Sequence, residues 1–207
     1  MSSIESELRN NSILRRQYEE LFNERFGYTL HRPNSPHDIV KMLRLDDLAL
    51  DIHRREATLR FDGRALQWIE DGEVTRRWPA VSGRPGYHGK EHQHTRELGP
   101  LPEGRYSALQ DDFQRWEETN IFNRAACLLR LINIKAGRWP GCTRAWGTRR
   151  IGLEPRAGTK VFGRSNFTIH GGSYPGSAGC IDLTSSMESF AKEFLYYAKD
   201  MELEVRY

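Results

Sequence analysis

The 207-residue sequence lacks several features that would place it in a class at once. No stretch approaches the roughly 18–20 apolar residues that a membrane span needs, so we expect no membrane span. The start of the chain, MSSIESELRNNSILRRQYEELF, has no apolar core of signal-peptide length, so we expect a chain made in the cytoplasm without a cleavable signal. The 31 Lys and Arg residues nearly balance 28 Asp and Glu, and the net charge is +3. Because no dense basic run is present, nucleic acid is not expected as a partner.

Cysteine is scarce, with three residues at Cys127, Cys142 and Cys180. An odd number does not make a disulfide framework and leaves at least one free thiol. Cys127 lies in the apolar run ACLLRLI, which is typical of a small buried residue. Cys142 lies in WPGCTRAWG, a loop sequence. A Cys127–Cys142 bridge stays open, because spacing alone does not show that two cysteines are close.

The chain is long enough for one ordinary domain with an appended segment. Five Trp, eight Tyr and nine Phe can build a core, and this aromatic content argues against a disordered chain. Near the N-terminus, charged residues separate apolar residues at helical spacing: Leu14, Tyr18, Leu21 and Phe22. This spacing predicts a helix over 4–26, and a Ser-Pro pair predicts a second helix over about 36–46. We therefore divide the chain into a helical N-terminal extension, 1–55, and a second domain, 56–207.

From residue 57 the pattern changes to β-structure. Three segments alternate apolar and polar residues and are broken by Asp-Gly or Gly, as in a meander with hairpin turns: ATLRFDG, RALQWIEDG and EVTRRWPAVSG. Further strands are predicted in GRYSAL, RRIGLEP and TKVFGRSNFTIH. Residues 111–147 give no clear assignment. Ser185 and Glu188 have the spacing of a capping box before a helix, and MELEVRY predicts a closing strand. The fold class is therefore mainly β (α+β), with a C-terminal helix.

The segment FTIHGGSYPGSAGCIDL carries the strongest chemical signal. It places His170 ten residues before Cys180, with Gly179 next to the cysteine. A thiol becomes a useful nucleophile when a base or a cation lowers its pKa, and a histidine at a strand end can supply that base. Gly179 allows a sharp turn that leaves the sulfur approachable. The backbone N–H groups of Gly179 and Cys180 are candidates for an oxyanion hole.

A third group is expected to orient the imidazole of His170. Asp182 is one candidate, because a carboxylate two residues after the thiol could reach the ring. A backbone carbonyl near Gly171 or Gly172 is the other, and the sequence leaves the choice open.

These residues resemble a known family. HGG…SAGCIDL is similar to the active-site signature of L,D-transpeptidases of the YkuD type, in which a histidine precedes a Ser-His-Gly-Cys segment followed by an apolar residue, Arg and Leu. The matching positions are Ser177, Gly179, Cys180, Ile181 and Leu183. Ala178 stands where the family usually has histidine, and Asp182 where it usually has arginine. Together with GPLPEGRY and GRSNFTIHGG, the segment resembles transpeptidase-like effectors of type VI secretion systems, over about residues 57–207.

The resemblance implies a β-sandwich or barrel catalytic domain that acts on peptidoglycan stem peptides. The family's cysteine attacks the carbonyl of meso-diaminopimelate at its bond to D-alanine, and water, a D-amino acid or a second stem resolves the acyl-enzyme. No cofactor and no metal are implied. Cys180, His170 and Asp182 would be catalytic, with Gly171 and Gly172 as backbone contributors beside Gly179. Since Asp182 replaces the family arginine, substrate binding would pass to Arg164, or to Arg149 and Arg150, together with Ser177.

The implied substrate lies outside the cytoplasmic membrane, yet the sequence predicts no signal peptide. Export by an injection machine would resolve this mismatch. The sequence thus predicts an antibacterial effector, active in the target-cell periplasm, with a cognate immunity protein and a secretion-apparatus or chaperone component as partners. One alternative is a cytosolic L,D-carboxypeptidase that trims recycled muropeptides. Another is a non-catalytic relative that binds peptide.

Two other groups of residues are weaker candidates. His88, His92 and His94 have a spacing that could bind zinc, but a zinc site needs a fourth ligand and a defined scaffold, so the sequence favours a polar loop that rims the cleft. Three tryptophans could stack on sugar rings, or belong to the core or a lid: Trp116, Trp139 and Trp146.

Overall fold

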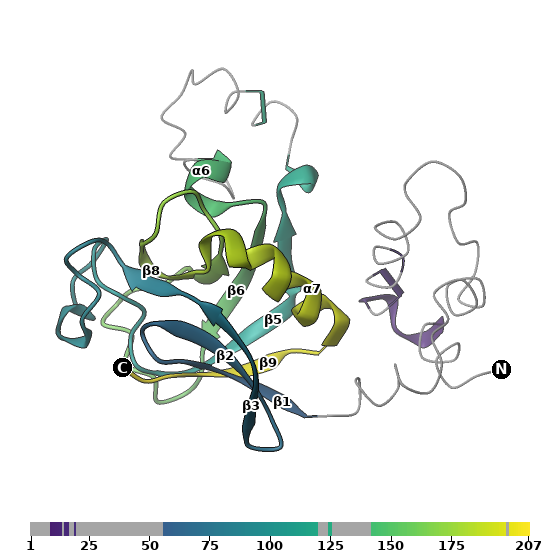
Figure 1. The fold of residues 1–207 in the computed structure, drawn as a ribbon, viewed down its shortest axis with the longest axis horizontal. Coiled ribbons are helices and arrows are strands. Elements are labelled where there is room, and N and C mark those ends of the chain that lie inside the picture. The colour runs from purple at the N-terminus through teal and green to yellow at the C-terminus, as the bar shows by residue number, and fades with distance from the viewer. Residues whose placement is uncertain are drawn as a thin grey trace. The chain divides into compact units, whose positions relative to one another are not determined.

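The structure is a computed structural model (Figure 1). It describes residues 9–13, 15, 16, 19, 56–119, 124, 125, 142–197 and 199–207. The compact unit that contains the β-sheet comprises Ala57–Ala191 and Asp200–Tyr207. The described residues of the first predicted helix are helical at 9–10, 12–13, 15–16 and 19, and the second predicted helix lies outside the described residues. The boundary between an extension and a catalytic domain stays a prediction.

A single mixed sheet dominates the described part of the chain. Its order is β3-β2-β1-β9-β5-β6-β7-β8-β4. The strands are β1 Ala57–Phe61, β2 Ala65–Glu70, β3 Glu73–Pro79, β4 Val81–Gly83, β5 Gly104–Arg115, β6 Arg149–Pro155, β7 Phe167–His170, β8 Ser177–Asp182 and β9 Met201–Val205. Short 3₁₀ turns lie at Lys90–His92, Trp116–Glu118 and Thr184–Ser186, and the helices are α6 Cys142–Trp146 and α7 Met187–Tyr197.

The two outermost strands of this sheet, β3 and β4, are nearly one continuous strand. Only Ala80 separates Pro79 from Val81. Because one residue spans a few ångströms, the two edges of the sheet must meet at this point. The sheet therefore curls into a nearly closed, barrel-like layer, and the predicted mainly β fold class with a C-terminal helix is confirmed.

The first three strands form the predicted meander. β2 and β3 are joined by Asp71 and Gly72, whose φ angles are 52° and 82°. Two consecutive positive φ angles are the requirement of a type I′ hairpin turn, which explains the Asp-Gly pair. Before β2, the Asp62 carboxylate accepts hydrogen bonds from the N–H groups of Arg64 and Ala65, at 2.9 and 2.7 Å. The local turn chemistry therefore agrees with the strand pattern.

Alternation along the strands builds the core. In β1, Ala57, Leu59 and Phe61 are buried, while the two residues between them are exposed. β9 pairs in parallel with β1 and buries Leu203 and Val205 in the same way, which confirms the predicted closing strand. A period of two with one buried face is what a half-buried strand requires.

The unassigned region 111–147 contributes to β5, which is long and irregular. Its pairing with β6 shifts register between Ala108 and Phe113, so the strand continues past a bulge to Arg115. At the other end of the region, Cys142 begins α6 and is disulfide-bonded. Cys127, the partner considered from the sequence, lies outside the described residues.

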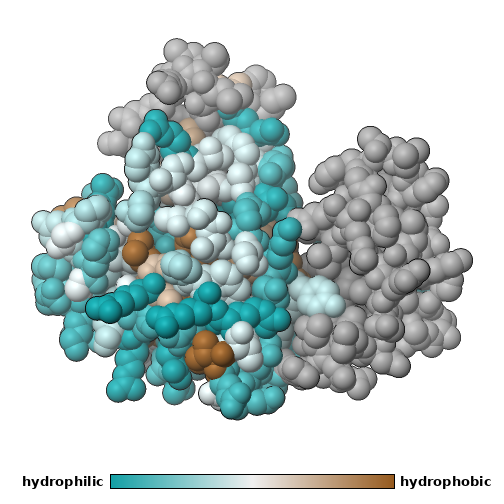
Figure 2. Space-filling model, viewed as in Figure 1, coloured by the Kyte–Doolittle hydropathy of each residue, from teal (hydrophilic) through white to brown (hydrophobic). Residues whose placement is uncertain are grey.

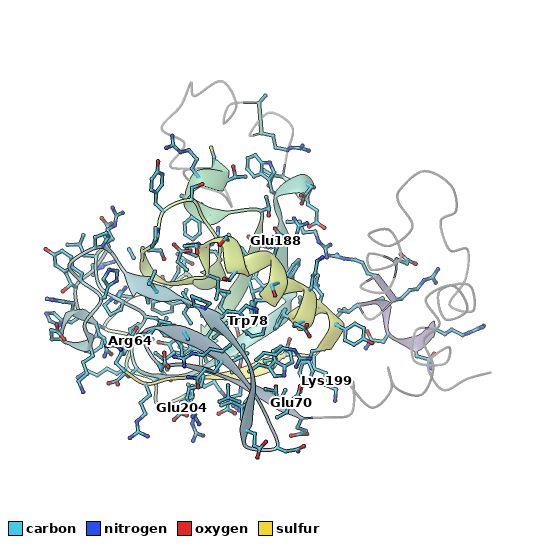
Figure 3. All side chains as sticks on the ribbon, viewed as in Figure 1. Arg64, Glu70, Trp78, Glu188, Lys199 and Glu204 are labelled. Atoms are coloured by element: carbon cyan, nitrogen blue, oxygen red, sulfur yellow. The ribbon has the colours of Figure 1, made fainter. Side chains whose placement is uncertain are left out.

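The start of α7 packs against the meander, and α7 crosses in front of the sheet in Figure 1. The rings of Phe190 and Trp78 lie 5.1 Å apart, and Trp78 Nε1 donates to Ser189 Oγ at 3.1 Å. Figure 3 labels Trp78 and, on α7, Glu188. The predicted capping box is wrong: the Glu188 carboxylate accepts a hydrogen bond from Thr148 Oγ1, so a tertiary partner has replaced the local one.

The visible face of the described part is largely hydrophilic (Figure 2). Four large hydrophobic side chains are exposed singly, at Ile13, Val74, Phe162 and Tyr174. None of the helices in the described ranges is both long and apolar enough to cross a bilayer.

Candidate active site

Three neighbouring strands bring the predicted catalytic residues onto one face of the sheet. His170 on β7 is opposite Arg150 on β6 and Asp182 on β8. Paired residues of adjacent strands point to the same face, and so do residues two apart along a strand. Cys180 precedes Asp182 by two residues, so it lies on this face as well. The sheet register therefore groups Arg150, His170, Asp182 and Cys180.

The imidazole of His170 is fully buried and has partners at both nitrogens. Nδ1 lies 2.5 Å from the Gly171 carbonyl oxygen, and Nε2 lies 2.9 Å from Ser177 Oγ. A carbonyl oxygen can only accept, so Nδ1 carries the proton in the neutral ring. Nε2 then presents a lone pair and accepts from the Ser177 hydroxyl. The tautomer is the one that a general base acting at Nε2 needs.

Burial also decides the charge of this ring. Desolvation lowers the pKa of His170 to about 4, the Gly171 hydrogen bond opposes this shift, and the positive charge of Arg150 adds to it. The buried site disfavours the charged form more than one hydrogen bond can offset. His170 is therefore neutral at pH 7; it is a weaker base than an ordinary imidazole and, once protonated, a stronger acid.

Cys180 is a free, buried thiol held on a tightly anchored strand. Its Sγ lies 3.9 Å from the carbonyl oxygen of Asn166, to which the thiol can donate. Behind it, Ser82 Oγ donates to the Cys180 carbonyl at 2.7 Å and accepts from Leu101 N–H at 2.8 Å. These bonds connect β8 to β4 and the 99–102 loop, and they fix the backbone that carries the thiol.

Two buried arginines act on Cys180 electrostatically. Burial lowers the pKa of Arg150 and of Arg164, and attraction to a negative charge on Cys180 raises both. Arg150 also lies 4.1 Å from the centre of the Trp146 ring, and that ring lies 4.6 Å from the His170 ring. Trp146 thus covers the base and holds the cation beside it.

The arginines proposed for substrate binding have different surroundings. Arg164 donates to the carbonyl oxygens of Gln93, Pro100 and Gly99, at 2.6, 2.7 and 2.9 Å, so it holds the 93–100 loop. Arg149 is committed to carboxylates, because its side chain lies 2.7 Å from Glu117 and 3.9 Å from Glu188. Of the three candidates, Arg150 alone shares the face of His170.

The Asp182 carboxylate does not contact the imidazole. It accepts from Gly176 N–H at 3.1 Å and from Thr184 N–H at 2.8 Å, and burial raises its pKa while these two bonds lower it. Of the two orienting groups left open by the sequence, the structure has the backbone carbonyl, at Gly171. Asp182 instead ties together the two ends of the segment that carries Cys180.

The glycines around His170 serve close packing. A Cβ on Gly171 would lie 2.8 Å from the Thr184 carbonyl oxygen, and one on Gly172 would lie 3.0 Å from the Ala145 carbonyl oxygen. Gly171 thus contributes its carbonyl to His170. The absence of a side chain at Gly172 allows α6 to pack closely against this loop. Gly179 has φ +84°, the turn that was expected before the thiol.

The other candidate groups are separated from one another. His88 Nδ1 contacts the Ser82 carbonyl at 2.8 Å, His92 packs against Tyr87, and His94 packs against Phe162. Within the described ranges no three His, Cys, Asp or Glu side chains are grouped as a metal site would need. Trp146 covers His170, Trp116 is half-buried, and Trp139 lies outside the described residues.

The chain is similar in structure to L,D-transpeptidases. Over 74% of this chain, L,D-transpeptidase 1 of Mycobacterium tuberculosis matches at 15% identity, with 63% of its own length and a TM-score of 0.39. An L,D-transpeptidase of Mycobacterium smegmatis matches over 74% at 14% identity, with 59% of its length and a TM-score of 0.38. Bd1075 of Bdellovibrio bacteriovorus matches over 72% at 14% identity, with 47% of its length and a TM-score of 0.45.

The chain thus spans about half to two-thirds of the length of these structures. No protein-family model matches the sequence, and a search of curated proteins returns no match. At these identities and TM-scores, function has to be argued from the site itself.

Sequence reasoning missed two contacts of this site. The Ser177 hydroxyl on Nε2 of His170 was expected to contact substrate instead, and Asn166 as partner of the thiol was not considered. Ser177 had a signal, since it belongs to the same motif as Cys180. Asn166 had a weak one: it precedes the strand of His170, and its φ of 61° marks a turn.

Gly179→Ala should destabilise the protein by roughly 2–4 kcal/mol and disturb the site. The new Cβ would lie 2.4 Å from Nη2 of Arg164, which three hydrogen bonds hold in place, and φ would remain at +84°. Gly158→Ala is the matched control, because its φ is +88° and no atom lies within 4 Å. We expect that control to cost about 1 kcal/mol. If urea denaturation shows the same loss of unfolding free energy for both variants, the contact with Arg164 is unimportant.

Proposed function

We propose that this chain is a cysteine-dependent enzyme that modifies peptidoglycan stem peptides, and that it serves as an antibacterial effector. The chemistry would be that of an L,D-carboxypeptidase or an L,D-transpeptidase, with a thioester intermediate on Cys180. One observation carries the proposal: a buried thiol and a neutral, oriented histidine share a sheet face with a buried arginine. A purely structural core has no need to bury these three groups together.

The first step is attack by sulfur on the amide carbonyl that links residue three of the stem to D-alanine. Sγ loses its proton to Nε2 of His170, after Ser177 releases that nitrogen, and forms a bond to the carbonyl carbon. Arg150 lies on the same sheet face as Cys180 and supplies a positive charge there. The oxyanion of the tetrahedral intermediate is stabilised by the backbone N–H groups of Gly179 and Cys180.

The second step breaks the carbon–nitrogen bond. His170 gives its proton to the departing amine of D-alanine, and a thioester remains on Cys180. Because burial and Arg150 disfavour the imidazolium, this proton transfer is strongly downhill. Water then releases the shortened stem, whereas an amine of a free D-amino acid or of a second stem gives exchange or a cross-link. In each case the incoming nucleophile loses one proton and the Cys180 thiol is restored.

One feature supports the effector part of the proposal. The disulfide at Cys142 favours action in an oxidising compartment such as the periplasm, because the cytosol keeps thiols reduced. An immunity protein, and a chaperone or secretion component, belong to the same proposal.

Mass spectrometry of muropeptides tests the enzymatic proposal. Incubation of the purified chain with disaccharide tetrapeptides should give tripeptides that lack the terminal alanine, and added D-amino acids should appear in its place. Intact tetrapeptides after prolonged incubation would contradict the proposal and favour a peptide-binding protein.

Directed expression tests the effector proposal. The chain behind an added export signal should inhibit growth of a susceptible bacterium, with swollen or misdivided cells, while cytoplasmic expression should be tolerated. An exported Cys180→Ala chain is the control and should be harmless. If the exported enzyme is active but does not inhibit growth, the recycling role is favoured. If the wild-type and Cys180→Ala chains are equally toxic after export, the toxicity does not come from this active site.

A further inference from the structure

An exposed tyrosine is held in place next to the candidate active site. Tyr174 is 65% exposed, the largest value among the exposed large hydrophobic side chains of the described residues. Its hydroxyl accepts from Nη2 of Arg144 at 2.8 Å, and the Arg144 guanidinium carbon lies 5.4 Å from the centre of its ring. Two contacts to one partner give the ring a defined orientation.

Tyr174 and Arg144 both lie within a few residues of groups that form the candidate active site. Tyr174 lies in the loop between His170 and Ser177, four residues after the base. Arg144 lies on α6, two residues before Trp146, which covers His170. The Arg144 carbonyl also accepts from Ser173 N–H at 2.9 Å, so α6 and the 171–176 loop lie side by side (Figure 1).

The charge of Arg144 has no carboxylate partner among the residues that the structure describes, and its side chain is exposed. By contrast, Arg149 on the next strand lies against two carboxylates. A guanidinium has five N–H donors, and the one bond to Tyr174 leaves donors for a ligand.

A stability role explains this pair poorly. An exposed cation–π contact contributes only about 0.5–1 kcal/mol, and a rigid exposed ring carries a cost in hydration of its apolar face. Phe162, another exposed ring, has a different setting, because the Lys160 ammonium and the His94 ring contact it. The arrangement of Arg144 and Tyr174 has the chemistry of a recognition site: donors for an anion next to a flat apolar surface.

We propose that Arg144 and Tyr174 form a substrate subsite that binds either the residue-two carboxylate or the side-chain carboxylate of residue three of the stem peptide, with the tyrosine ring packed on the adjoining aliphatic segment. The inference rests on the proposed function and names a specificity determinant for it. Stem peptides suit the subsite, since they carry carboxylates on short aliphatic branches. Guanidinium–carboxylate pairs are among the stronger polar contacts at exposed sites.

The test compares a tetrapeptide stem that has all its carboxylates with two analogues, each lacking one. One analogue is amidated at the residue-two carboxylate and the other at the side-chain carboxylate of residue three. Arg144→Ala should lower kcat/KM for the carboxylate stem by about 10–100-fold, mostly through KM, because the contact exists before and during the reaction. For one of the analogues the same substitution should cost less than about threefold.

Further variants separate the two halves of the subsite. Arg144→Lys should keep part of the effect, and Tyr174→Phe should stay closer to the wild type than Tyr174→Ala, because the ring is retained. Arg206→Ala, which removes an exposed arginine after β9, is the matched control and should leave all three stems unchanged. An equal loss on all three stems from Arg144→Ala, or no loss on any, overturns the subsite.

Calorimetry with the Cys180→Ala protein separates failure of the subsite from failure of the proposed reaction. This protein should bind the carboxylate stem at least about tenfold more tightly than one analogue, and the added Arg144→Ala substitution should abolish that preference. The preference would support the subsite even if the wild type released no D-alanine. Equal binding of the three stems, or no binding of any, overturns it.

Discussion

Cys180→Ala should reduce turnover of tetrapeptide stems by at least about a thousandfold while leaving the fold intact. The substitution removes the sulfur that forms the thioester, and neither water nor another side chain replaces it in the same position. The small alanine fits a site where the thiol is 3% exposed and contacts Asn166 O at 3.9 Å, so circular dichroism should be unchanged. Mass spectrometry of the quenched wild type should show an acyl adduct on the peptide that contains Cys180.

Ser177→Ala is the informative companion, because the Ser177 hydroxyl is the group that Nε2 of His170 contacts. If sulfur is the nucleophile, loss of this hydroxyl should change the rate by about tenfold or less, since Nε2 remains oriented by the Gly171 bond. A result in which Ser177→Ala is inactive and Cys180→Ala is active would assign the reaction to a serine. An adduct on Ser177 would do the same.

The strand pair that carries His170 and Cys180 was predictable from the sequence because its signals are local. A buried strand ends at His170, a glycine precedes Cys180, and both residues lie in one short motif. The Asp71-Gly72 turn and the alternation of β1 were predictable for the same reason: turn chemistry and a period of two are properties of neighbouring residues.

The choice among arginines was not predictable, because it depends on strand register. Arg149 and Arg150 are adjacent on β6, so their side chains point to opposite faces. Only the pairing of Arg150 with His170 decides which of them faces the thiol. Glu188 shows the same limit, since a local capping box competes with Thr148, which lies 40 residues away in sequence. Contacts between distant segments decided both cases.

The second large effect concerns stability in acid. In the unfolded chain His170 should titrate near its ordinary pKa of 6.5, whereas in the native protein burial and Arg150 lower that pKa to about 4. Between these values the unfolded state binds more protons, so the free energy of unfolding rises with pH across this window and is level above it. The stability that His170 contributes at pH 7 is lost as pH falls from about 6.5 to about 4, and it amounts to about 3 kcal/mol.

Comparison of the wild type with His170→Gln isolates this contribution. Asp182 acts in the opposite sense, because its raised pKa favours the native state in acid. Asp182 and the other six histidines are present in both proteins, so their contributions cancel in the difference. Relative to the wild type, His170→Gln should gain about 3 kcal/mol in urea-denaturation stability between pH 7 and pH 4, whatever its stability at pH 7. Parallel stability curves, or an imidazole resonance of His170 that titrates near pH 6.5 in NMR spectra of the native protein, would show that the ring is not held in the buried, neutral state on which its role as a base depends.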